Sequence, residues 1–221
     1  SHTHSGPITF ADEKSPRRNR EYIDLLVERV CAAVNLAKQQ LVPARLQFAR
    51  GKADVGINRR EKMADGHFEI GRNPRGARDD SLQVVNIFEE REGGHRLATL
   101  VNYACHAVAL SAESYGLSAD WPGAMRRVVE AETGARCLFI QGAGADINPR
   151  GGPSRDYGRM QRLGQSVAGG VIQAWADIQD LREEMALGGV TEQVWVPLQE
   201  ADGQSAATLQ ESLVSALKLP W

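Results

Sequence analysis

Two histidines at the start of the chain have the type and spacing of metal ligands. His2 and His4 stand two positions apart in the segment SHTHSGP, residues 1–7. Side chains at positions i and i+2 of an extended segment point to the same side, so both imidazoles would face one pocket. Neutral imidazole is a common zinc ligand, bound at about 2.0–2.1 Å. The same pair could instead belong to a tag remnant or a solvated tail.

A third histidine and a glycine-rich bend follow two predicted strands. His106 comes directly after the apolar run RLATLVNYAC, residues 96–105, where an imidazole is either a ligand or a hydrogen-bonded core or rim residue. The segment GAGAD, residues 142–146, follows the apolar run RCLFIQ, residues 136–141. Such a bend lets backbone N–H groups approach a ligand closely, or it simply permits tight packing. It is not a nucleotide-binding P-loop, because no Gly-Lys-Ser/Thr follows.

Two charged residues stand at the ends of predicted elements. Arg59 leaves a predicted strand and enters a polar, basic segment, and we expect its side chain to point inward. Asp120 precedes Trp121-Pro122-Gly123, a sequence that favours the start of a helix with the aspartate as its cap.

The composition is that of an ordinary globular protein. The 221 residues are 42% hydrophobic and 24% charged, with a net charge of -2, which argues against a nucleic-acid partner bound through phosphate neutralisation. No apolar run approaches the roughly 20 residues that span a bilayer. Cys31, Cys105 and Cys137 are few, odd in number and set among apolar neighbours, so we expect buried free thiols.

Alternating helices and strands predict an α/β fold, with a mixed β-sheet core flanked by α-helices. Apolar residues at three- and four-residue spacing predict an amphipathic helix from about residue 16 to 40, with Ser15 as its cap and Pro16 in its first position. Further helices are predicted from Asp120, over 154–177 and over 201–221. Strands are predicted over 44–55, 82–88, 96–105, 136–141 and 188–196, the second and third of them forming a hairpin. Residues 58–80 show no helical or strand periodicity of apolar residues, which predicts a long loop.

Four stretches, taken in order, resemble the neutral/alkaline ceramidase family. They are SHTHSGP (1–7), INRR (57–60), VNYACHAVALS with LSADWPG (101–123) and LFIQGAGADINPR (138–150). The resemblance covers about 150 residues and implies the catalytic-domain portion of the family. We therefore expect residues 1–221 to form a single ceramidase-like α/β domain belonging to a longer chain.

The resemblance implies a zinc amidohydrolase that cleaves the N-acyl bond of ceramide. It implies His2 and His106 as metal ligands, and His4 and Arg59 at the substrate end of the site. Asp120 matches an acidic position of the family and would orient a ligand or cap the helix. The family carries a serine where this chain has Gly142, so no serine nucleophile is available there. The family's further zinc ligands, a glutamate and a tyrosine, have no matching motif in residues 152–221.

Three functional hypotheses follow from these residues. The first is a Zn²⁺-dependent hydrolase of an amide in a small-molecule or lipid substrate. The second is a ceramidase-like ligand-binding domain without catalysis, and the third is a metal hydrolase of phosphate or peptide substrates, which the basic segment after Arg59 favours. The sequence leaves open the acyl chain, the oligomeric state and the compartment, whether secreted, periplasmic or cytoplasmic.

Overall fold

The computed structural model describes residues 2–9, 15–176, 178, 180–182 and 188–195. Contacts divide the chain into two units, Ser1–Met185 and Ala186–Trp221. In the second unit, residues 188–195 are exposed and form neither helix nor strand. The strand predicted over 188–196 is therefore wrong at these positions, where no described strand supplies hydrogen-bond partners. The helix predicted over 201–221 lies outside the described residues.

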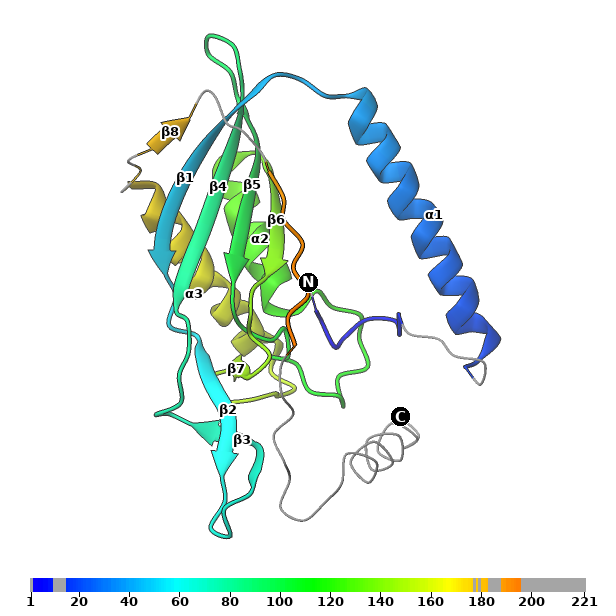
Figure 1. Ribbon diagram of the computed structural model, residues 1–221, viewed down its shortest axis with the longest axis vertical. Helices are drawn as coiled ribbons and strands as arrows, with labels where there is room; N and C mark the ends of the chain where they lie inside the picture. The colour runs from blue at the N-terminus through cyan, green and yellow to red at the C-terminus, as the bar shows by residue number, and fades with distance from the viewer. Residues whose placement is uncertain (1, 10–14, 177, 179, 183–187, 196–221) are drawn as a thin grey trace. The chain divides into compact units, whose positions relative to one another are not determined.

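A five-stranded sheet in the order β6-β5-β4-β1-β8 forms the centre of the first unit (Figure 1). Its strands are β1 (Ala44–Lys52), β4 (Ser81–Glu89), β5 (Arg96–Tyr103), β6 (Arg136–Gln141) and β8 (Asp180–Arg182). β5 and β6 run parallel, whereas the other neighbours run antiparallel. The predicted mixed sheet and the predicted hairpin, formed by β4 and β5, are confirmed.

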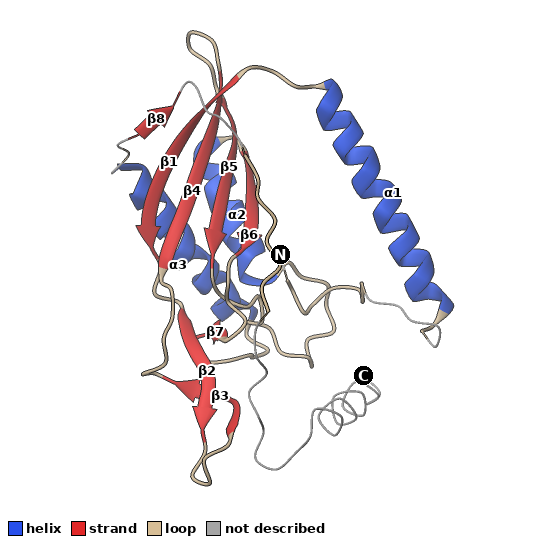
Figure 2. Cartoon of the chain, viewed as in Figure 1, coloured by secondary structure: helices blue, strands red, loops and turns tan. Residues whose placement is uncertain are grey.

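Two helices, α2 (Asp120–Thr133) and α3 (Tyr157–Ala176), pack on one face of this sheet (Figure 2). The inward side chains alternate along β4 and β5, and Val84, Val101 and Cys137 on three adjacent strands are fully buried. Glycines allow the closest approaches. A Cβ atom on Gly170 of α3 would lie 2.4 Å from the Lys52 carbonyl oxygen of β1. The fold is thus an α/β fold with a mixed sheet flanked by helices.

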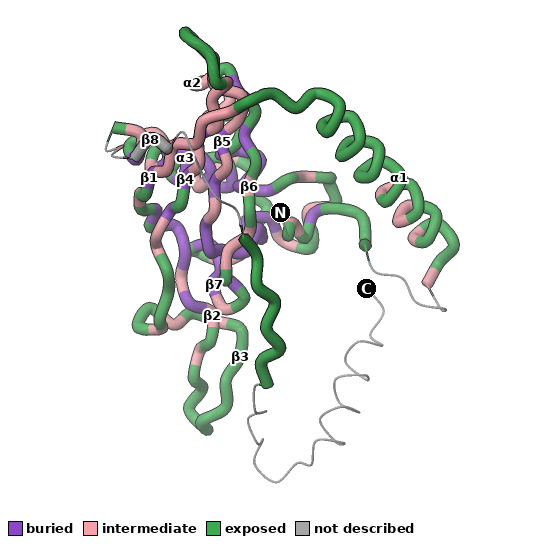
Figure 3. The backbone as a smooth tube through the Cα atoms, turned by 45° about the horizontal axis from the view of Figure 1, so that its top comes forward, coloured by how far each residue is buried: buried purple, intermediate pink, exposed green. Residues whose placement is uncertain are grey.

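The first helix, α1 (Arg17–Gln39), is confirmed with a start one residue later than predicted, since Pro16 takes the N-cap position and makes no side-chain cap. The helix buries no residue, and Figure 3 shows it exposed or half-buried along its length. Its apolar stripe is therefore not part of the described core. Among the described residues, no helix is long and apolar enough to cross a membrane.

A second sheet, in the order β3-β2-β7, replaces the long loop predicted over residues 58–80. Its strands are β2 (Gly56–Lys62), β3 (Phe68–Asn73) and β7 (Ile147–Pro149). The prediction of a loop was wrong because β3 is exposed or half-buried at every residue, so its sequence carries no inward-facing apolar alternation. β7 follows the glycine-rich bend in the chain and pairs antiparallel with β2.

The three cysteines divide by their burial. Cys105 and Cys137 are buried free thiols, as predicted. Cys31 is exposed because α1 buries none of its residues, so that part of the prediction was wrong.

Candidate metal centre

The segment that carries His2 and His4 is fastened to the first unit through the residues between and after them. Thr3 forms a parallel β-bridge with Ala107, and its hydroxyl donates to the Ser118 carbonyl at 2.8 Å. The Ser118 N–H in turn donates to the carbonyl of Ser5 at 2.8 Å. These bonds place the His-x-His segment beside the chain that follows β5, although His2 itself has a left-handed φ of 57° and is not in a regular strand.

His106 is held from three sides. Its Nδ1 lies 2.7 Å from the Gly144 carbonyl oxygen and 3.2 Å from that of Ile147. Its backbone N–H donates to Ile147, and its carbonyl accepts the indole N–H of Trp121 at 2.8 Å. Because the backbone carbonyls can only accept hydrogen bonds, Nδ1 carries the proton and donates it to them, and the Nε2 atom is left as the acceptor and potential ligand. The side chain is buried, with 6% of its surface exposed.

The three imidazoles converge although more than 100 residues separate His106 from the other two. The ring centroids of His2 and His106 are 4.7 Å apart, and one nitrogen from each of the three rings lies within 4.8 Å of the others. The Nε2 atoms of His2 and His4 are 3.3 Å apart. Two nitrogens bound tetrahedrally to zinc at 2.0–2.1 Å would lie about 3.3–3.4 Å apart. The three imidazoles suit zinc as donors, and the separation of the His2 and His4 nitrogens matches that of two bound ligands.

Burial and neighbouring charges favour neutral imidazoles in this cluster. Burial lowers the pKa of His4 most, and the charges of His2, His106 and Arg59 lower it further. Burial also lowers the pKa of His106, against the opposing effect of its bond to Gly144. A neutral imidazole keeps a lone pair for a metal, so the centre is preorganised for cation binding without prior loss of protons.

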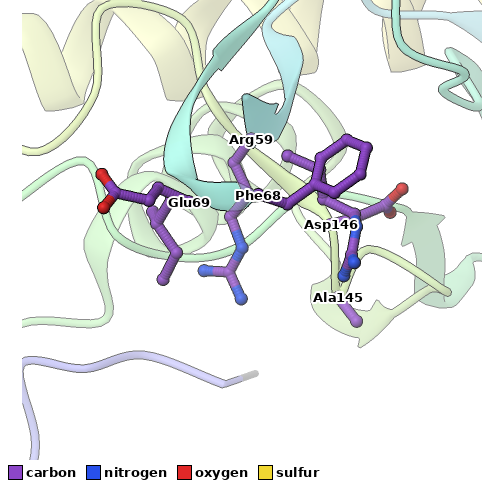
Figure 4. Close-up of a pocket in the computed structure, with 7 residues that line it drawn as sticks. Arg59, Phe68, Glu69, Ala145 and Asp146 are labelled. Carbon is purple, nitrogen blue, oxygen red and sulfur yellow. The ribbon is translucent and has the colours of Figure 1, made fainter. Parts of the chain in front are cut away.

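Arg59 approaches the centre from β2. Its backbone N–H donates to the Asp146 carbonyl at 2.7 Å, and its Nη1 lies 3.4 Å from Oδ1 of Asn148. Figure 4 shows the side chain extending between the β2–β3 hairpin, which carries Phe68, and the segment that carries Asp146. A cavity of about 330 Å³ opens there. The inward orientation predicted for Arg59 agrees with this position.

The Asp120 carboxylate is hydrogen-bonded to backbone N–H groups. Its Oδ1 accepts the N–H groups of Ala109 (3.0 Å) and Trp121 (2.7 Å), and its Oδ2 accepts that of Leu110 (2.9 Å). The residue is 1% exposed and holds a left-handed φ of 53° at the first position of α2, so the prediction of Asp120 as the N-cap was wrong, because Ala119 takes that position. It therefore fastens the segment after His106 to the start of α2, and its charge raises the pKa of His4 against the larger lowering by burial.

The glycine-rich bend packs tightly instead of presenting its glycine N–H groups to a ligand. The N–H of Gly142 donates to Tyr103, and that of Gly144 donates to Gly142. A Cβ atom on Gly144 would lie 2.7 Å from the Cys105 nitrogen, and one on Gly142 would lie 3.1 Å from the Ala104 nitrogen. The bend thereby brings the Gly144 carbonyl to His106. Sequence patterns do not reveal this role, because a backbone carbonyl has no residue signature.

Comparisons with known proteins support the fold. No family model and no curated protein sequence matches the chain. Among solved structures, the neutral ceramidase from Pseudomonas aeruginosa matches with a TM-score of 0.57 and 14% identity, over 72% of this chain and 27% of that one. A ceramidase complexed with C2 matches with a TM-score of 0.50 and 14% identity, over 63% of this chain and 23% of that one. This chain thus has a ceramidase-like fold and spans about a quarter of the length of these structures.

Proposed function

We propose that this chain contributes the metal-binding part of a zinc-dependent hydrolase that cleaves the N-acyl amide bond of a ceramide-like lipid. The observation that carries the proposal is the convergence of His2, His4 and His106, with Nδ1 of His106 tied to a backbone carbonyl. The ceramidase identity of the two similar structures supports the choice of an amide substrate.

His2 and His106 would hold the zinc ion, in keeping with the family resemblance. Zinc, when bound in such a site, polarises a carbonyl and makes water a competent nucleophile near neutral pH. His106 suits the ligand role because the Gly144 and Ile147 carbonyls fix its orientation. Fixed orientation of a ligand imidazole raises metal affinity, since little freedom is lost on binding.

His4 would transfer the proton of the reaction, and Arg59 would stabilise the negative charge that develops. In amide hydrolysis, a water oxygen forms a bond to the carbonyl carbon, the C–N bond breaks, and a proton reaches the leaving nitrogen. His4, favoured in the neutral state, can accept the proton of the attacking water and pass it to the amine. The Arg59 guanidinium can stabilise the negative charge that develops on the carbonyl oxygen.

The zinc content of purified protein tests this proposal. We expect about one zinc ion per wild-type chain by elemental analysis. Both His106→Ala and His2→Ala should reduce that content strongly, whereas His95→Ala, an exposed histidine paired with Glu89 outside the cluster, should not change it. Amides, including ceramides, and phosphate and peptide substrates should then be offered to the zinc-loaded protein. A wild type without bound zinc, or equal zinc in all four proteins, contradicts the proposal.

A ligand-binding domain without catalysis is the second candidate. The cluster of described residues holds three imidazoles and no carboxylate. Gly142 also occupies the position at which the ceramidase family has a serine. Stoichiometric binding of a ceramide with no release of fatty acid, in zinc-loaded protein, would favour this candidate.

A further inference from the structure

The cavity beside the metal centre is lined by two adjacent arginines. Arg59 and Arg60 of β2 lie on one side of it, Phe68 and Ile70 of β3 on another. Arg60 also lies over the Phe68 ring, with its guanidinium carbon 5.6 Å from the ring centroid. The cavity therefore combines two cationic groups with an apolar wall.

An irregularity of the hairpin lies beside the cavity, on the β3 strand. Asn58 pairs with Asn73 and Arg60 with Ile70, so Arg59 stands opposite two residues of β3. The extra residue belongs to β3, so the bulge bends β3 and re-aims its side chains toward the cavity that Arg59 and Arg60 of β2 line. The Glu61 carboxylate accepts the N–H of Arg72 at 2.8 Å and so fastens the extra residue.

The carboxylates that line the cavity are engaged elsewhere. Glu69 contacts Nε2 of His67 at 3.0 Å, and Asp146 accepts the side-chain amide of Asn58 at 2.8 Å. Figure 4 shows both carboxylates turned away from the Arg59 guanidinium, to either side of it. In the described part of the chain, no ion pair joins Arg59 or Arg60 to a carboxylate.

This cavity adjoins the metal centre through Arg59. The Arg59 side chain contacts Asn148, and the preceding residue, Ile147, binds the backbone N–H of His106. The positive charge of Arg59 also lowers the pKa values of His4 and His106. Arg59 thus lines the cavity and is also linked to His106 through Asn148 and Ile147.

We propose that this cavity binds an anionic group of the substrate, and that Arg60 is a specificity-determining residue. The preferred substrate class would be an N-acyl amide that carries a carboxylate near the amide, such as an N-acyl amino acid, over a neutral amide of the same length. Guanidinium groups bind carboxylates through charge-assisted, often bidentate hydrogen bonds. Phe68 and Ile70 would contact the aliphatic part. The inference rests on the proposed function in one respect: the amide bond to be hydrolysed is placed at the imidazoles.

Calorimetric titration with two matched probes tests the inference. N-lauroylglycine and N-lauroylethanolamine share the acyl chain and the amide, and only the first is anionic. Below the concentrations at which they form micelles, wild-type chain should bind N-lauroylglycine about tenfold more tightly or better. Arg60→Gln should bring the two affinities to within about twofold of each other. Arg72→Gln, an exposed arginine of the same hairpin that does not line the cavity, should keep the wild-type preference.

Two results would overturn the inference. One is equal binding of the two probes by wild-type protein, and the other is an undiminished preference in Arg60→Gln. Because the titration needs no turnover, it should be run on chelator-treated as well as zinc-loaded protein. A chain that lacks hydrolysis but keeps the Arg60-dependent preference would refute the proposed catalysis and sustain the subsite. A chain that hydrolyses amides without the preference would refute the subsite alone.

Discussion

Replacing Asp120 by asparagine separates a structural role of its carboxylate from a catalytic one. The buried carboxylate accepts three backbone N–H groups, from Ala109, Leu110 and Trp121. An asparagine amide of the same size offers one oxygen and one NH₂ group. If its oxygen keeps the two bonds of Oδ1, the NH₂ group faces the Leu110 N–H, donor against donor.

The expected cost follows from these bonds. Hydrogen bonds to charged groups contribute about 1.5–3 kcal/mol each, neutral ones about 0.5–1.5 kcal/mol, and a buried unpaired donor costs about 1–3 kcal/mol. One bond is lost and two lose their charge, each weakening by about 1–1.5 kcal/mol, so with the unpaired Leu110 N–H counted within the lost bond we expect Asp120→Asn to lower the free energy of unfolding by about 3.5–6 kcal/mol. Ser118→Ala removes only the hydroxyl that accepts the Asp120 N–H at 2.9 Å and should cost about 1 kcal/mol.

Urea unfolding followed by circular dichroism would measure both changes. At saturating zinc, the folded Asp120→Asn protein should hold as much metal as the wild type, because the contacts of the carboxylate are to backbone amides. A variant with wild-type stability that lost zinc or activity would refute the reasoning. The carboxylate would then act on the imidazoles or the substrate.

Two further predictions concern packing and thiol reactivity. Gly164→Ala should lower the free energy of unfolding by about 1–3 kcal/mol, because a Cβ atom there would lie 2.6 Å from the Trp121 carbonyl oxygen and 2.5 Å from the Ala124 Cβ. A Cβ atom on Gly169 of the same helix would meet nothing within 4 Å, so Gly169→Ala should raise the free energy of unfolding by up to about 1 kcal/mol. Thermal or urea unfolding measures both changes. Equal effects of the two substitutions would contradict the α2–α3 packing. At pH 8, iodoacetamide should label Cys31 rapidly, while Cys105 and Cys137 react only after unfolding, because burial raises the pKa of each thiol to about 12. Mass spectrometry of native and denatured samples locates the label, and rapid native labelling of Cys105 would show that the strand end beside His106 opens.

Local sequence patterns predicted much of the secondary structure, since they report directly on which faces are buried. The apolar alternation of residues 82–88 and 96–105 predicted β4 and β5, and the run 136–141 predicted β6 with its bounds unchanged. Helical spacing predicted α3 within a few residues. The same reasoning failed for β3, whose exposed residues need no alternation.

The Gly169-Gly170 pair shows where local patterns stop being informative. The sequence predicts that a glycine pair in a helix permits a close neighbour. Only the tertiary structure decides that Gly170 meets β1 while Gly169 faces open space. The difference is set by the rotation of α3 against the sheet, which depends on packing over the whole core.

The sequence by itself supplied the donor types of the candidate centre, since the imidazoles of His2 and His4 stand two positions apart, but His2 has a left-handed φ of 57° that the expected extended segment did not predict. It could not determine the partner of that pair. The segment reaches His106 through the Thr3–Ala107 bridge and the bonds to Ser118, contacts between residues more than 100 positions apart. The Gly144 carbonyl that orients His106 also reaches it only when segments far apart in the sequence come together. Residue types provide the chemistry, and long-range hydrogen bonds between backbone segments place it.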